Sequence, residues 1–402
     1  MDFDIAIIGA GPAGLSFACS LKDSGLKLLV LEKQSKADLA TPNNDGRDIA
    51  LTHFSRDVMM KQGSWQRIKD ANISPLKHAE VIDGDSPYVL RFEAPKKDTS
   101  LGFLISNHII RQAIFEEFNT LDNVTLMDET EVSCVSTNDQ AGTVQLKGGT
   151  SFQVSLIVAA DTRFSLSRQQ MGISTDSHDF GRTAIVCQME HALSHNNTAF
   201  ECFHYGQTLA ALPMPKNTSS IVITLPSTKA KTVLGMSNET FNADMEKRLN
   251  SQLGKMTQLD KRYSYPLVGV HANKFVSQRF ALIGDAAVGM HPVTAHGFNL
   301  GLSGQEILAT ELIQAKKKGR DFYSDDVLKA YQRKHMLITR PLYHGTNMVV
   351  DLFTNDSFPA TILRKAVLRL SNNIPPVKWA IQHKLMAKKQ MESLLPPFPS
   401  LF

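Results

Sequence analysis

A glycine pattern near the N-terminus offers the first recognisable chemistry in this chain of 402 residues. Gly9, Gly11 and Gly14 follow the apolar run Ile5–Ile8 and precede helix-forming residues. The first glycine permits a tight turn, the second lets the backbone approach a pyrophosphate, and the third lets helix and strand pack closely. The start of the helix presents free N–H groups and partial positive charge to an anion. The spacing therefore predicts a dinucleotide site.

Glu32 ends a second apolar run, Lys27–Leu31, at the distance that a strand–helix–strand unit requires. A carboxylate at this place accepts hydrogen bonds from ribose hydroxyls and disfavours a 2′-phosphate. The pattern fits FAD and NAD equally well. A glycine turn in another kind of α/β protein stays the alternative interpretation.

Two further motifs lie far along the chain, and each is weak alone. They are Ala160-Asp161-Thr162-Arg163-Phe164-Ser165 and Gly284-Asp285-Ala286-Ala287. Asp285 follows the buried-strand pattern Arg279–Ile283, which favours cofactor binding, although an aspartate there also suits a helix cap. In this order, the three motifs indicate one chain wrapped around one dinucleotide.

With these motifs the chain resembles the FAD-dependent aromatic hydroxylases, the single-component group A flavoprotein monooxygenases. Within them it is most similar to the ubiquinone-biosynthesis hydroxylases, in particular the demethoxyubiquinol hydroxylases. The resemblance runs almost from end to end. It includes Asp45-Gly46-Arg47, Asn107-His108-Ile109-Ile110-Arg111, Leu209-Ala210-Ala211-Leu212-Pro213, the stretch from Gly284 through His291-Pro292 to Gly297-Phe298-Asn299-Leu300-Gly301, and Leu352-Phe353 with Pro375-Pro376-Val377-Lys378.

The resemblance implies a role for each of several residues. The ADP half of FAD would be held by Gly9, Gly11, Ala13, Gly14, Glu32 and Lys33. Arg47 and Arg111 would contact the dinucleotide, with solvated charges as the alternative. Asp161 would serve FAD and a transient nicotinamide donor, and Gly284 with Asp285 would bind ribityl or ribose hydroxyls. The flavin ring and the catalytic site would be bordered by Pro292, His296, Gly297, Phe298 and Asn299.

Two residues depart from the family pattern. Thr162 stands where the family has glycine, and a β-branched residue has a high cost at positive φ. We therefore expect another conformation for that loop, which leaves its nicotinamide-binding role open. Ala295-His296 stands where many relatives carry Gly-Gln, so His296 faces substrate or flavin, or is an ordinary loop histidine.

The expected fold class is α/β of the mixed α+β kind, with the p-hydroxybenzoate-hydroxylase-like architecture that the resemblance implies. A Rossmann-like FAD-binding domain would comprise residues 1–70, 100–178 and 275–345. It would be interleaved with an antiparallel-sheet substrate domain of residues 71–99 and 179–274. Residues 346–402 would form a C-terminal helical segment.

Local patterns predict the elements of these domains. Helices are expected over Pro12–Gly25, Asn107–Phe118 and Phe241–Leu253, and through most of the chain after Gly304. Besides the strands named above, strands are expected over Ala79–Phe92, Asn123–Met127, Thr143–Lys147, Phe152–Ala159, Ala184–Met189, Ala199–Tyr205, Thr208–Leu212 and Ser220–Leu225.

The composition is that of a folded soluble protein, with 42% hydrophobic and 20% charged residues. A net charge of +4 without a basic and aromatic stripe gives no reason to expect nucleic acid. The four cysteines lack C-x-x-C spacing, which predicts free thiols in a reducing compartment. No histidine, cysteine and carboxylate spacing predicts a metal site. Without a secretory signal or an apolar run of about 20 residues, a cytoplasmic location is expected.

A basic segment near the C-terminus bears on membrane contact. Between Thr361 and Met391 the sequence has seven Lys and Arg residues and no Asp or Glu. Such an amphipathic pattern suits peripheral contact with the inner face of the cytoplasmic membrane. The alternative is a terminal helix that packs on its own domain.

The resemblance implies a monooxygenase that hydroxylates the ring of a polyprenyl phenol or quinol in ubiquinone synthesis. It would use O2 through a flavin C4a-hydroperoxide, with demethoxyubiquinol-type C5 or C6 hydroxylation, and its partners would include a ubiquinone-biosynthesis complex. A second glycine motif is absent, so electrons would come from transiently bound NAD(P)H or a separate reductase. The alternatives are a hydroxylase of a small soluble aromatic, a non-catalytic flavin-binding assembly component, and a geranylgeranyl-type reductase.

Overall fold

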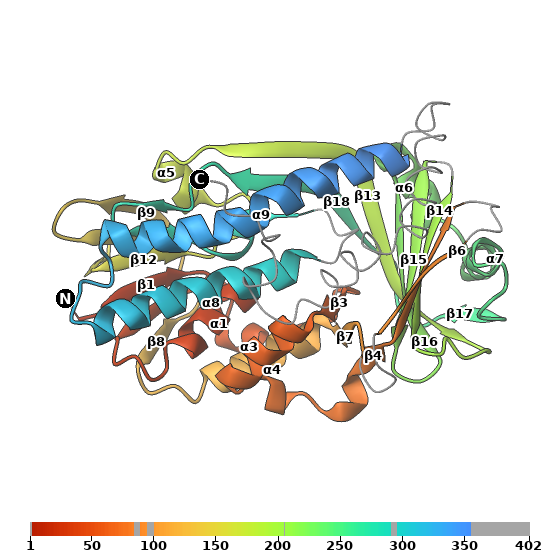
Figure 1. Cartoon of the computed structure of the whole chain (residues 1–402), viewed down its shortest axis with the longest axis horizontal. Coiled ribbons are helices and arrows are strands. Elements are labelled where there is room, and N and C mark those ends of the chain that lie inside the picture. The colour runs from red at the N-terminus through yellow and green to blue at the C-terminus, as the bar shows by residue number, and fades with distance from the viewer. Residues whose placement is uncertain (1, 84–88, 95–99, 205, 291–295, 355–402) are drawn as a thin grey trace, which may run out of the picture.

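Two large sheets of different kinds lie beside each other in the computed structural model (Figure 1). The structure describes residues 2–83, 89–94, 100–204, 206–290 and 296–354. One sheet is built around the N-terminal strand and is flanked by long helices. The other is antiparallel and lies at the opposite end of the molecule.

The first sheet has six strands in the order β19-β20-β12-β1-β2-β8. Its strands are β1 (Ile5–Ile8), β2 (Leu28–Leu31), β8 (Val124–Met127), β12 (Leu156–Ala159), β19 (Val276–Ser277) and β20 (Phe280–Leu282). All pairs are parallel except β19 with β20 at the edge. Every residue of β1, β2 and β12 is buried, as expected for a parallel sheet covered on both faces.

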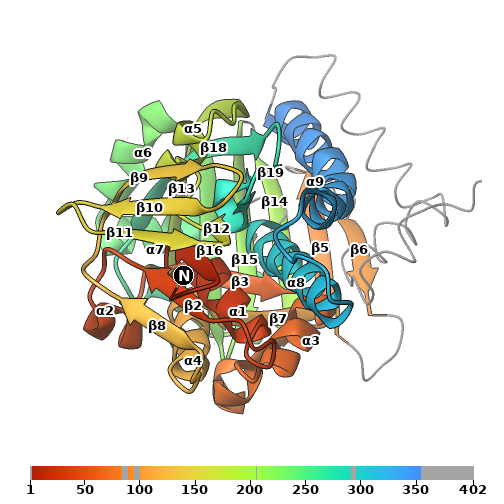
Figure 2. The same cartoon turned by 90° about the vertical axis from the view of Figure 1, so that its left-hand side faces the viewer.

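Helices cover one face of this parallel sheet, and a small antiparallel sheet lies over the other (Figure 2). The helices are α1 (Pro12–Ser20), α4 (Asn107–Phe118), α8 (His296–Lys317) and α9 (Asp325–Thr354). The small sheet consists of β9 (Val132–Thr137), β10 (Gly142–Leu146) and β11 (Ser151–Val154).

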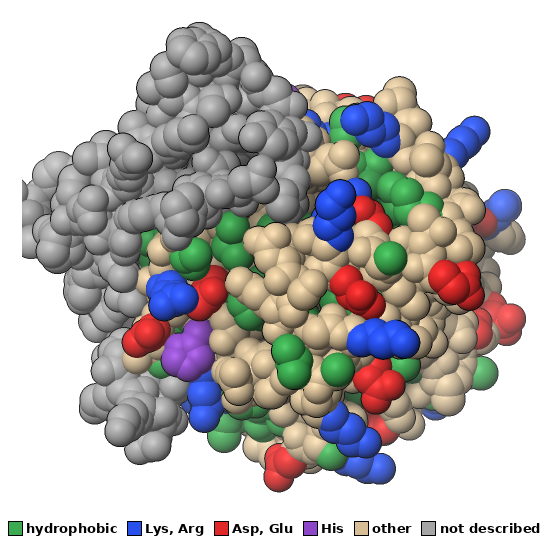
Figure 3. All heavy atoms as spheres, turned by 90° about the vertical axis from the view of Figure 1, so that its right-hand side faces the viewer, with side chains coloured by type: hydrophobic (Ala, Val, Ile, Leu, Met, Phe, Trp, Pro, Cys, Tyr) green, Lys and Arg blue, Asp and Glu red, His purple; other side chains and the backbone are tan. Residues whose placement is uncertain are grey.

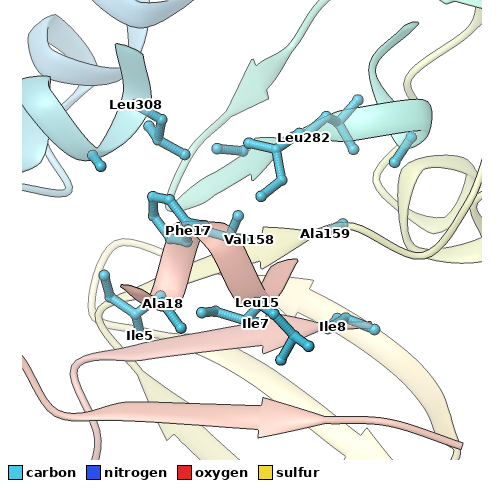
Figure 4. Close-up of a cluster of buried hydrophobic side chains, with 14 of the residues drawn as sticks. Ile5, Ile7, Ile8, Leu15, Phe17, Ala18, Val158, Ala159, Leu282 and Leu308 are labelled. Atoms are coloured by element: carbon cyan, nitrogen blue, oxygen red, sulfur yellow. The ribbon is translucent and has the colours of Figure 1, made fainter. Parts of the chain in front are cut away.

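A shared hydrophobic core fixes α1 against the sheet. Figure 4 shows Phe17 of α1, Val158 of β12 and Leu308 of α8 directed toward one another. All three side chains are fully buried. Burying one such side chain contributes about 1.5–3 kcal/mol, so the glycine turn before α1 is held in place by segments far away in sequence.

The antiparallel sheet has nine strands, and one pair in it, β5 with β14, is parallel. They are β5 (His78–Asp83), β6 (Val89–Glu93), β13 (Thr175–His191), β14 (Thr198–His204), β15 (Gln207–Met214), β16 (Thr218–Pro226), β17 (Met256–Gln258), β18 (Tyr263–Ala272) and β21 (Val288–Gly289). One face packs against α6 (Ser227–Leu234) and α7 (Asn238–Arg248) around buried Ile185, Ile221 and Ile223. In Figure 1, α7 lies on the side of the sheet away from the parallel sheet.

A third, three-stranded sheet lies between the two large ones. It consists of β3 (Asp48–Leu51), β7 (Gly102–Ser106) and β4 (Ser74–Leu76). The remaining α-helices of the described chain are α2 (Lys36–Ala40), α3 (His53–Gln62) and α5 (Leu166–Gln170). Gln188 of β13 donates a hydrogen bond of 3.0 Å from Nε2 to Oδ1 of Asp48, which ties the antiparallel sheet to β3.

The predicted architecture is confirmed, but several predicted elements have wrong bounds. The strand predicted over Phe152–Ala159 is two strands, β11 in the small sheet and β12 in the parallel sheet, and the strand predicted over Ala184–Met189 extends over Thr175–His191. The helix from Pro12 ends at Ser20, because the chain turns before Gly25, where φ is +65°. The helix predicted over Phe241–Leu253 begins at Asn238, since Ser237 caps it by accepting the Thr240 N–H at 3.2 Å. The strand predicted over Ala79–Phe92 is the antiparallel pair β5 and β6. The domain bounds stay a prediction.

The surface and the thiols agree with the composition. Figure 3 shows Lys and Arg side chains interspersed with Asp and Glu on the described part of one face. The four cysteines are free. Among the described residues, no helix has the length and hydropathy needed to cross a bilayer, and no cluster of metal-ligating residues is found. The basic segment Thr361–Met391 lies outside the described residues.

Candidate functional site

The glycine turn between β1 and α1 has the shape of a pyrophosphate cradle. Gly9 has φ of +103°, and a Cβ there would lie 2.7 Å from the Ala160 carbonyl oxygen. A Cβ at Gly14 would lie 2.0 Å from the Gly9 carbonyl oxygen, so only glycine lets α1 approach the turn. A Cβ at Gly11 would meet no atom within 4 Å. Gly11 thus faces open space at the start of α1, where a phosphate can reach the helix N–H groups.

Glu32 follows β2 and reaches back to this turn. Its carboxylate accepts the Ala10 N–H at 2.7 Å and the Gln34 N–H at 2.9 Å. Since each carboxylate oxygen has two lone pairs, capacity remains for ribose hydroxyls. Lys33 is exposed beside it. The structure therefore brings the acidic residue to the turn, as the spacing predicts.

Arg111 of α4 lies next to the same turn. It lines a small pocket together with Ala10, Pro12, Leu15 and Leu39. A guanidinium at this place is within reach of a phosphate bound at the start of α1. Its contact with the dinucleotide stays a prediction that this geometry supports.

The third motif approaches the first from β20. Gly284 has φ of +58°, and a Cβ there would lie 2.7 Å from the Ala13 Cβ. This close approach explains the small residue at Ala13. Asp285 follows with a half-exposed carboxylate, to which Arg163 donates from Nη2 at 3.3 Å. The second and third motifs are thus joined by an ion pair across 122 residues of sequence.

Arg47 lies where the parallel and antiparallel sheets meet. Its guanidinium donates from Nε at 3.0 Å and Nη2 at 2.6 Å to Oδ2 of Asp45, and it lies over the Tyr265 ring at 5.4 Å. Burial raises the pKa of Asp45, but the Arg47 hydrogen bonds and charge outweigh it and hold this pKa below its usual value. Asp285 is close enough to favour the charged form of Arg47. The pair Asp45–Arg47 is therefore a fixed ionic group beside Asp285.

The expectation that Thr162 changes the loop conformation is wrong. Thr162 keeps a φ of +79°, the value that a glycine adopts easily. The Ser165 N–H donates to the Thr162 carbonyl oxygen at 3.1 Å, and Asp161 accepts the Ser167 N–H at 3.1 Å. Because contacts on both sides fix the turn and the Thr162 side chain is exposed, the fold imposes the strained angle.

Asp161 keeps one carboxylate oxygen available. Its Oδ1 is buried and has no hydrogen-bond partner among the described residues. Buried Arg168 lies near it and donates to the Ala286 carbonyl oxygen at 2.8 Å. Burial lowers the pKa of Arg168, and the charge of Asp161 opposes that effect. An unsatisfied carboxylate oxygen next to the third motif suits a hydroxyl-bearing ligand.

The start of α8 is anchored by Asn299. Its side-chain amide donates to the Ala50 carbonyl oxygen at 2.8 Å, and its oxygen accepts the Thr52 N–H at 3.0 Å and the Ser55 hydroxyl at 2.7 Å. Asn299 is 9% exposed, so these bonds hold α8 against β3 and α3. Its side chain therefore acts structurally and fixes the position of the first turn of α8.

The other residues predicted at the flavin ring are placed only in part. Gly297 and Phe298 are half-buried in the first turn of α8, and a Cβ at Gly297 would meet no atom within 4 Å. His296 begins α8. Pro292 lies outside the described residues. The catalytic roles proposed for these residues stay predictions.

These features together fit an extended dinucleotide. The cradle at Gly11, the carboxylate of Glu32 and the carboxylate of Asp285 lie along the edge formed by the ends of β1, β2 and β20. Ligands of open α/β sheets bind at this carboxyl edge of the strands. The residues present therefore fit FAD.

Comparisons with known proteins decide the family. A family model described as an FAD binding domain matches residues 2–343. Ubiquinone hydroxylase UbiM of Neisseria meningitidis is 48% identical over 95% of this chain and 84% of its own length. The chain belongs to the FAD-dependent monooxygenases of the ubiquinone hydroxylase family. Ubiquinone hydroxylase UbiL of Rhodospirillum rubrum is 31% identical over 93% of this chain and 87% of its own length.

A solved structure confirms the fold of this monooxygenase. The crystal structure of p-nitrophenol 4-monooxygenase PnpA from Pseudomonas putida has a TM-score of 0.76 and 18% identity, covering 96% of this chain and 99% of the other. At this identity the likeness bears on the fold alone. It agrees with the predicted combination of a parallel FAD sheet, an antiparallel sheet and C-terminal helices.

Sequence reasoning missed two residues of this monooxygenase that the structure places at the site, Arg163 and Tyr265, and a third on the antiparallel sheet, Glu201. Arg163 belongs to the second motif, but nothing local predicts its ion pair with Asp285. Tyr265 donates its hydroxyl to the Asp45 carbonyl oxygen at 2.6 Å and lies under Arg47. Glu201 lies half-buried on the antiparallel sheet, with its Oε1 atom buried. A glutamate within the apolar strand pattern Phe200–Phe203 is the signal that points to it in the sequence.

Proposed function

We propose that this monooxygenase hydroxylates the aromatic ring of a polyprenylated ubiquinone precursor. The 48% identity to ubiquinone hydroxylase UbiM of Neisseria meningitidis carries the proposal. For the ring position we propose demethoxyubiquinol-type hydroxylation at C5 or C6. The support for the demethoxyubiquinol type of reaction, but not for either carbon, is 26% identity to the 3-demethoxyubiquinol 3-hydroxylase of Escherichia coli over 96% of this chain.

Bound FAD supplies the activation of O2 and the transfer of one oxygen atom to the ring. The protein holds and orients the reactants. Gly11 and Arg111 would bind the pyrophosphate, Glu32 a ribose, and Asp285 the ribityl hydroxyls. The Asn299 hydrogen bonds to Ala50 and Thr52 fix the first turn of α8, so the backbone of Gly297 and Phe298 would border the ring rigidly.

For the electron donor we propose NAD(P)H that docks transiently, with a separate reductase as the second possibility. The support is the glycine-like turn at Thr162, whose φ of +79° preserves the loop shape that a nicotinamide donor would need. Asp161 offers a buried, unsatisfied oxygen within the same loop. The proposed domain division, with FAD and substrate segments interleaved, would place this loop in the FAD-binding domain.

We also propose peripheral contact with the inner face of the cytoplasmic membrane, because a polyprenylated substrate partitions into lipid. The basic segment Thr361–Met391 would bind an anionic leaflet there, near other ubiquinone-biosynthesis proteins. The full chain should sediment with vesicles that contain anionic lipid. A variant with the lysines and arginines of this segment changed to glutamine should not, and equal sedimentation of both would contradict the proposal.

The test of the reaction is a mass-spectrometric profile of prenylated quinones in cells that lack this gene. Accumulation of a ring short of one hydroxyl or methoxyl would support the proposal and identify the carbon. The wild-type gene should restore the profile, and Asp285→Ala should not. The control is Asp57→Ala, which removes an exposed carboxylate paired with the adjacent Arg56 at 2.8 Å. An unchanged profile in the deleted cells would contradict the proposal and favour a small soluble aromatic substrate.

A further inference from the structure

The antiparallel sheet has two unlike faces. On the side of α6 and α7, Ile221 and Ile223 of the central strand β16 are almost fully buried. On the other face, Val222 of the same strand and Ala210 of β15 are half-buried. We call this the inner face, because Gln188 on it bonds to Asp48 of β3. An apolar residue in the middle of a sheet stays partly accessible only where no layer covers it fully.

Glu201 lies on the inner face. The flanking Phe200 and Cys202 belong to the core under α6 and α7, and side chains alternate along a strand, so Glu201 faces the other way. Its cross-strand neighbours are Ala210 on β15 and Val81 on β5. Both cross-strand neighbours are therefore apolar and offer the carboxyl group no side-chain hydrogen bond.

The carboxyl group of Glu201 is not satisfied by the fold. Its Oε1 atom is buried and accepts no hydrogen bond from any residue that the structure describes. Burial raises the pKa of Glu201 to about 8. A buried polar group without a partner destabilises a protein, so its presence calls for a functional reason.

The position of Glu201 relative to the flavin site follows from strand register. The row that starts at Glu201 continues through Ala210, Val222 and Val186 to Tyr263 of β18. These are four strand spacings, or about 19 Å at ~4.8 Å each. Tyr265, two residues along β18, lies under Arg47. Glu201 on β14 thus lies four strands away from β18, beside which the Asp45–Arg47 pair lies.

We propose that Glu201 binds the ring hydroxyl of the aromatic substrate and thereby determines which substrates, and which ring orientation, the enzyme accepts. The proposal rests on the proposed function, because it presumes a hydroxylated ring. A carboxyl group keeps an acceptor oxygen in either protonation state, so the ring hydroxyl donates to it. A site built around such a bond rejects analogues that lack the hydroxyl.

The test compares an ortho-prenylated phenol carrying one isoprene unit with its methyl ether, which cannot donate. Binding is followed by the visible absorbance of FAD in the holoenzyme. Wild type should bind the phenol more tightly, and Glu201→Met should lower this preference up to about tenfold, the effect of losing a buried hydrogen bond between neutral groups. Glu201→Gln keeps an acceptor oxygen and should retain part of the preference.

The matched control is Glu80→Met. Glu80 lies on the adjacent strand β5, where register pairs it with Phe200 on the opposite face, and it forms an ion pair of 3.0 Å with Arg91. This variant should keep the wild-type preference. Glu201→Met should also unfold at a higher urea concentration than wild type, because it removes an unsatisfied buried carboxyl from an apolar environment. A purely structural role for Glu201 predicts the reverse.

Two results would overturn the proposal: an unchanged preference in Glu201→Met, or no preference in wild type. Either is distinguishable from failure of the proposed function. If the wild-type gene still restores the quinone profile of deleted cells, the function stands and Glu201 alone is excluded. If the profile of the deleted cells is unchanged, the proposed function itself fails.

Discussion

The same substitution to alanine at two glycines of one turn should have two different effects. At Gly14 it should lower the stability of the fold, and at Gly11 it should weaken the binding of FAD. A Cβ at Gly14 would lie 2.0 Å from the Gly9 carbonyl oxygen, whereas ordinary contact begins near 3.4 Å. Gly14→Ala therefore forces a displacement of about 1.4 Å (3.4 − 2.0) between α1 and β1. Overpacking of this kind costs up to ~3 kcal/mol, and the better helix propensity of alanine returns ~1 kcal/mol. We expect a net loss of about 2 kcal/mol in the free energy of unfolding.

Gly11→Ala should leave the fold intact and weaken cofactor binding. Gly11 has φ of −70°, which alanine adopts freely, and its Cβ would meet no atom. Alanine is a slightly poorer helix cap than glycine, which lowers the stability, but it also restricts the unfolded chain, which raises the stability. These two effects nearly cancel, so the free energy of unfolding should change by less than ~1 kcal/mol. The new methyl group, however, occupies the space for the pyrophosphate. We expect the Kd for FAD to rise more than tenfold, or ~1.4 kcal/mol.

Urea unfolding of the apoproteins and titration of FAD fluorescence measure the two effects separately. Gly14→Ala should unfold at lower urea concentration than Gly11→Ala, and Gly11→Ala should lose FAD affinity without losing stability. Wild-type FAD affinity in Gly11→Ala would refute the placement of the pyrophosphate at this turn. Wild-type stability in Gly14→Ala would refute the close approach as a constraint.

Three further outcomes follow from the contacts described above. Thr162→Gly should raise the free energy of unfolding by about 1 kcal/mol, because glycine adopts φ of +79° without strain; a lower urea midpoint would contradict this. Asn299→Ala leaves buried partners unsatisfied and should cost about 2–4 kcal/mol by the same assay, and an unchanged midpoint would show that α8 has another anchor. Burial lowers the pKa of His335 to about 3 and of His271 to about 4, so both are neutral in the fold. The contribution of the two neutral histidines to the stability of the fold is complete above the pKa of an unfolded histidine, about 6.5. It is lost as the pH falls toward 3. The midpoint temperature of thermal unfolding should fall between pH 7 and pH 4. It should fall less steeply with pH in His335→Phe, and the same slope in both proteins would contradict this.

The three motifs can be interpreted from the sequence because each depends on local geometry. Gly9, Gly11 and Gly14 have the turn and the open space that their spacing predicts. Glu32 follows its strand and reaches the turn. The alternation of the antiparallel strands is also visible in the sequence, since the period of two is a property of each strand alone. The bounds of single elements do not follow from this period, because capping residues such as Ser237 decide where an element begins.

Thr162 shows where local reasoning fails. The preference of a β-branched residue against positive φ is real, and it predicts another loop. In the folded chain, hydrogen bonds at Asp161 and Ser165 and the ion pair of Arg163 fix the turn on both sides. Their combined effect exceeds the strain of one residue, which no local rule can weigh.

The parallel FAD sheet, the antiparallel sheet and the order of the cofactor motifs can all be predicted from the amino-acid sequence. Three contacts became visible only in the folded chain: Asn299 holds Thr52 across 247 residues, Arg163 pairs with Asp285, and Glu201 faces inward. The two groups differ in the sequence distance over which their interactions act. Turn geometry and hydrophobic period act over a few residues, whereas these contacts depend on strand register and on the simultaneous packing of distant segments, and a register shift of one residue would turn Glu201 to the other face.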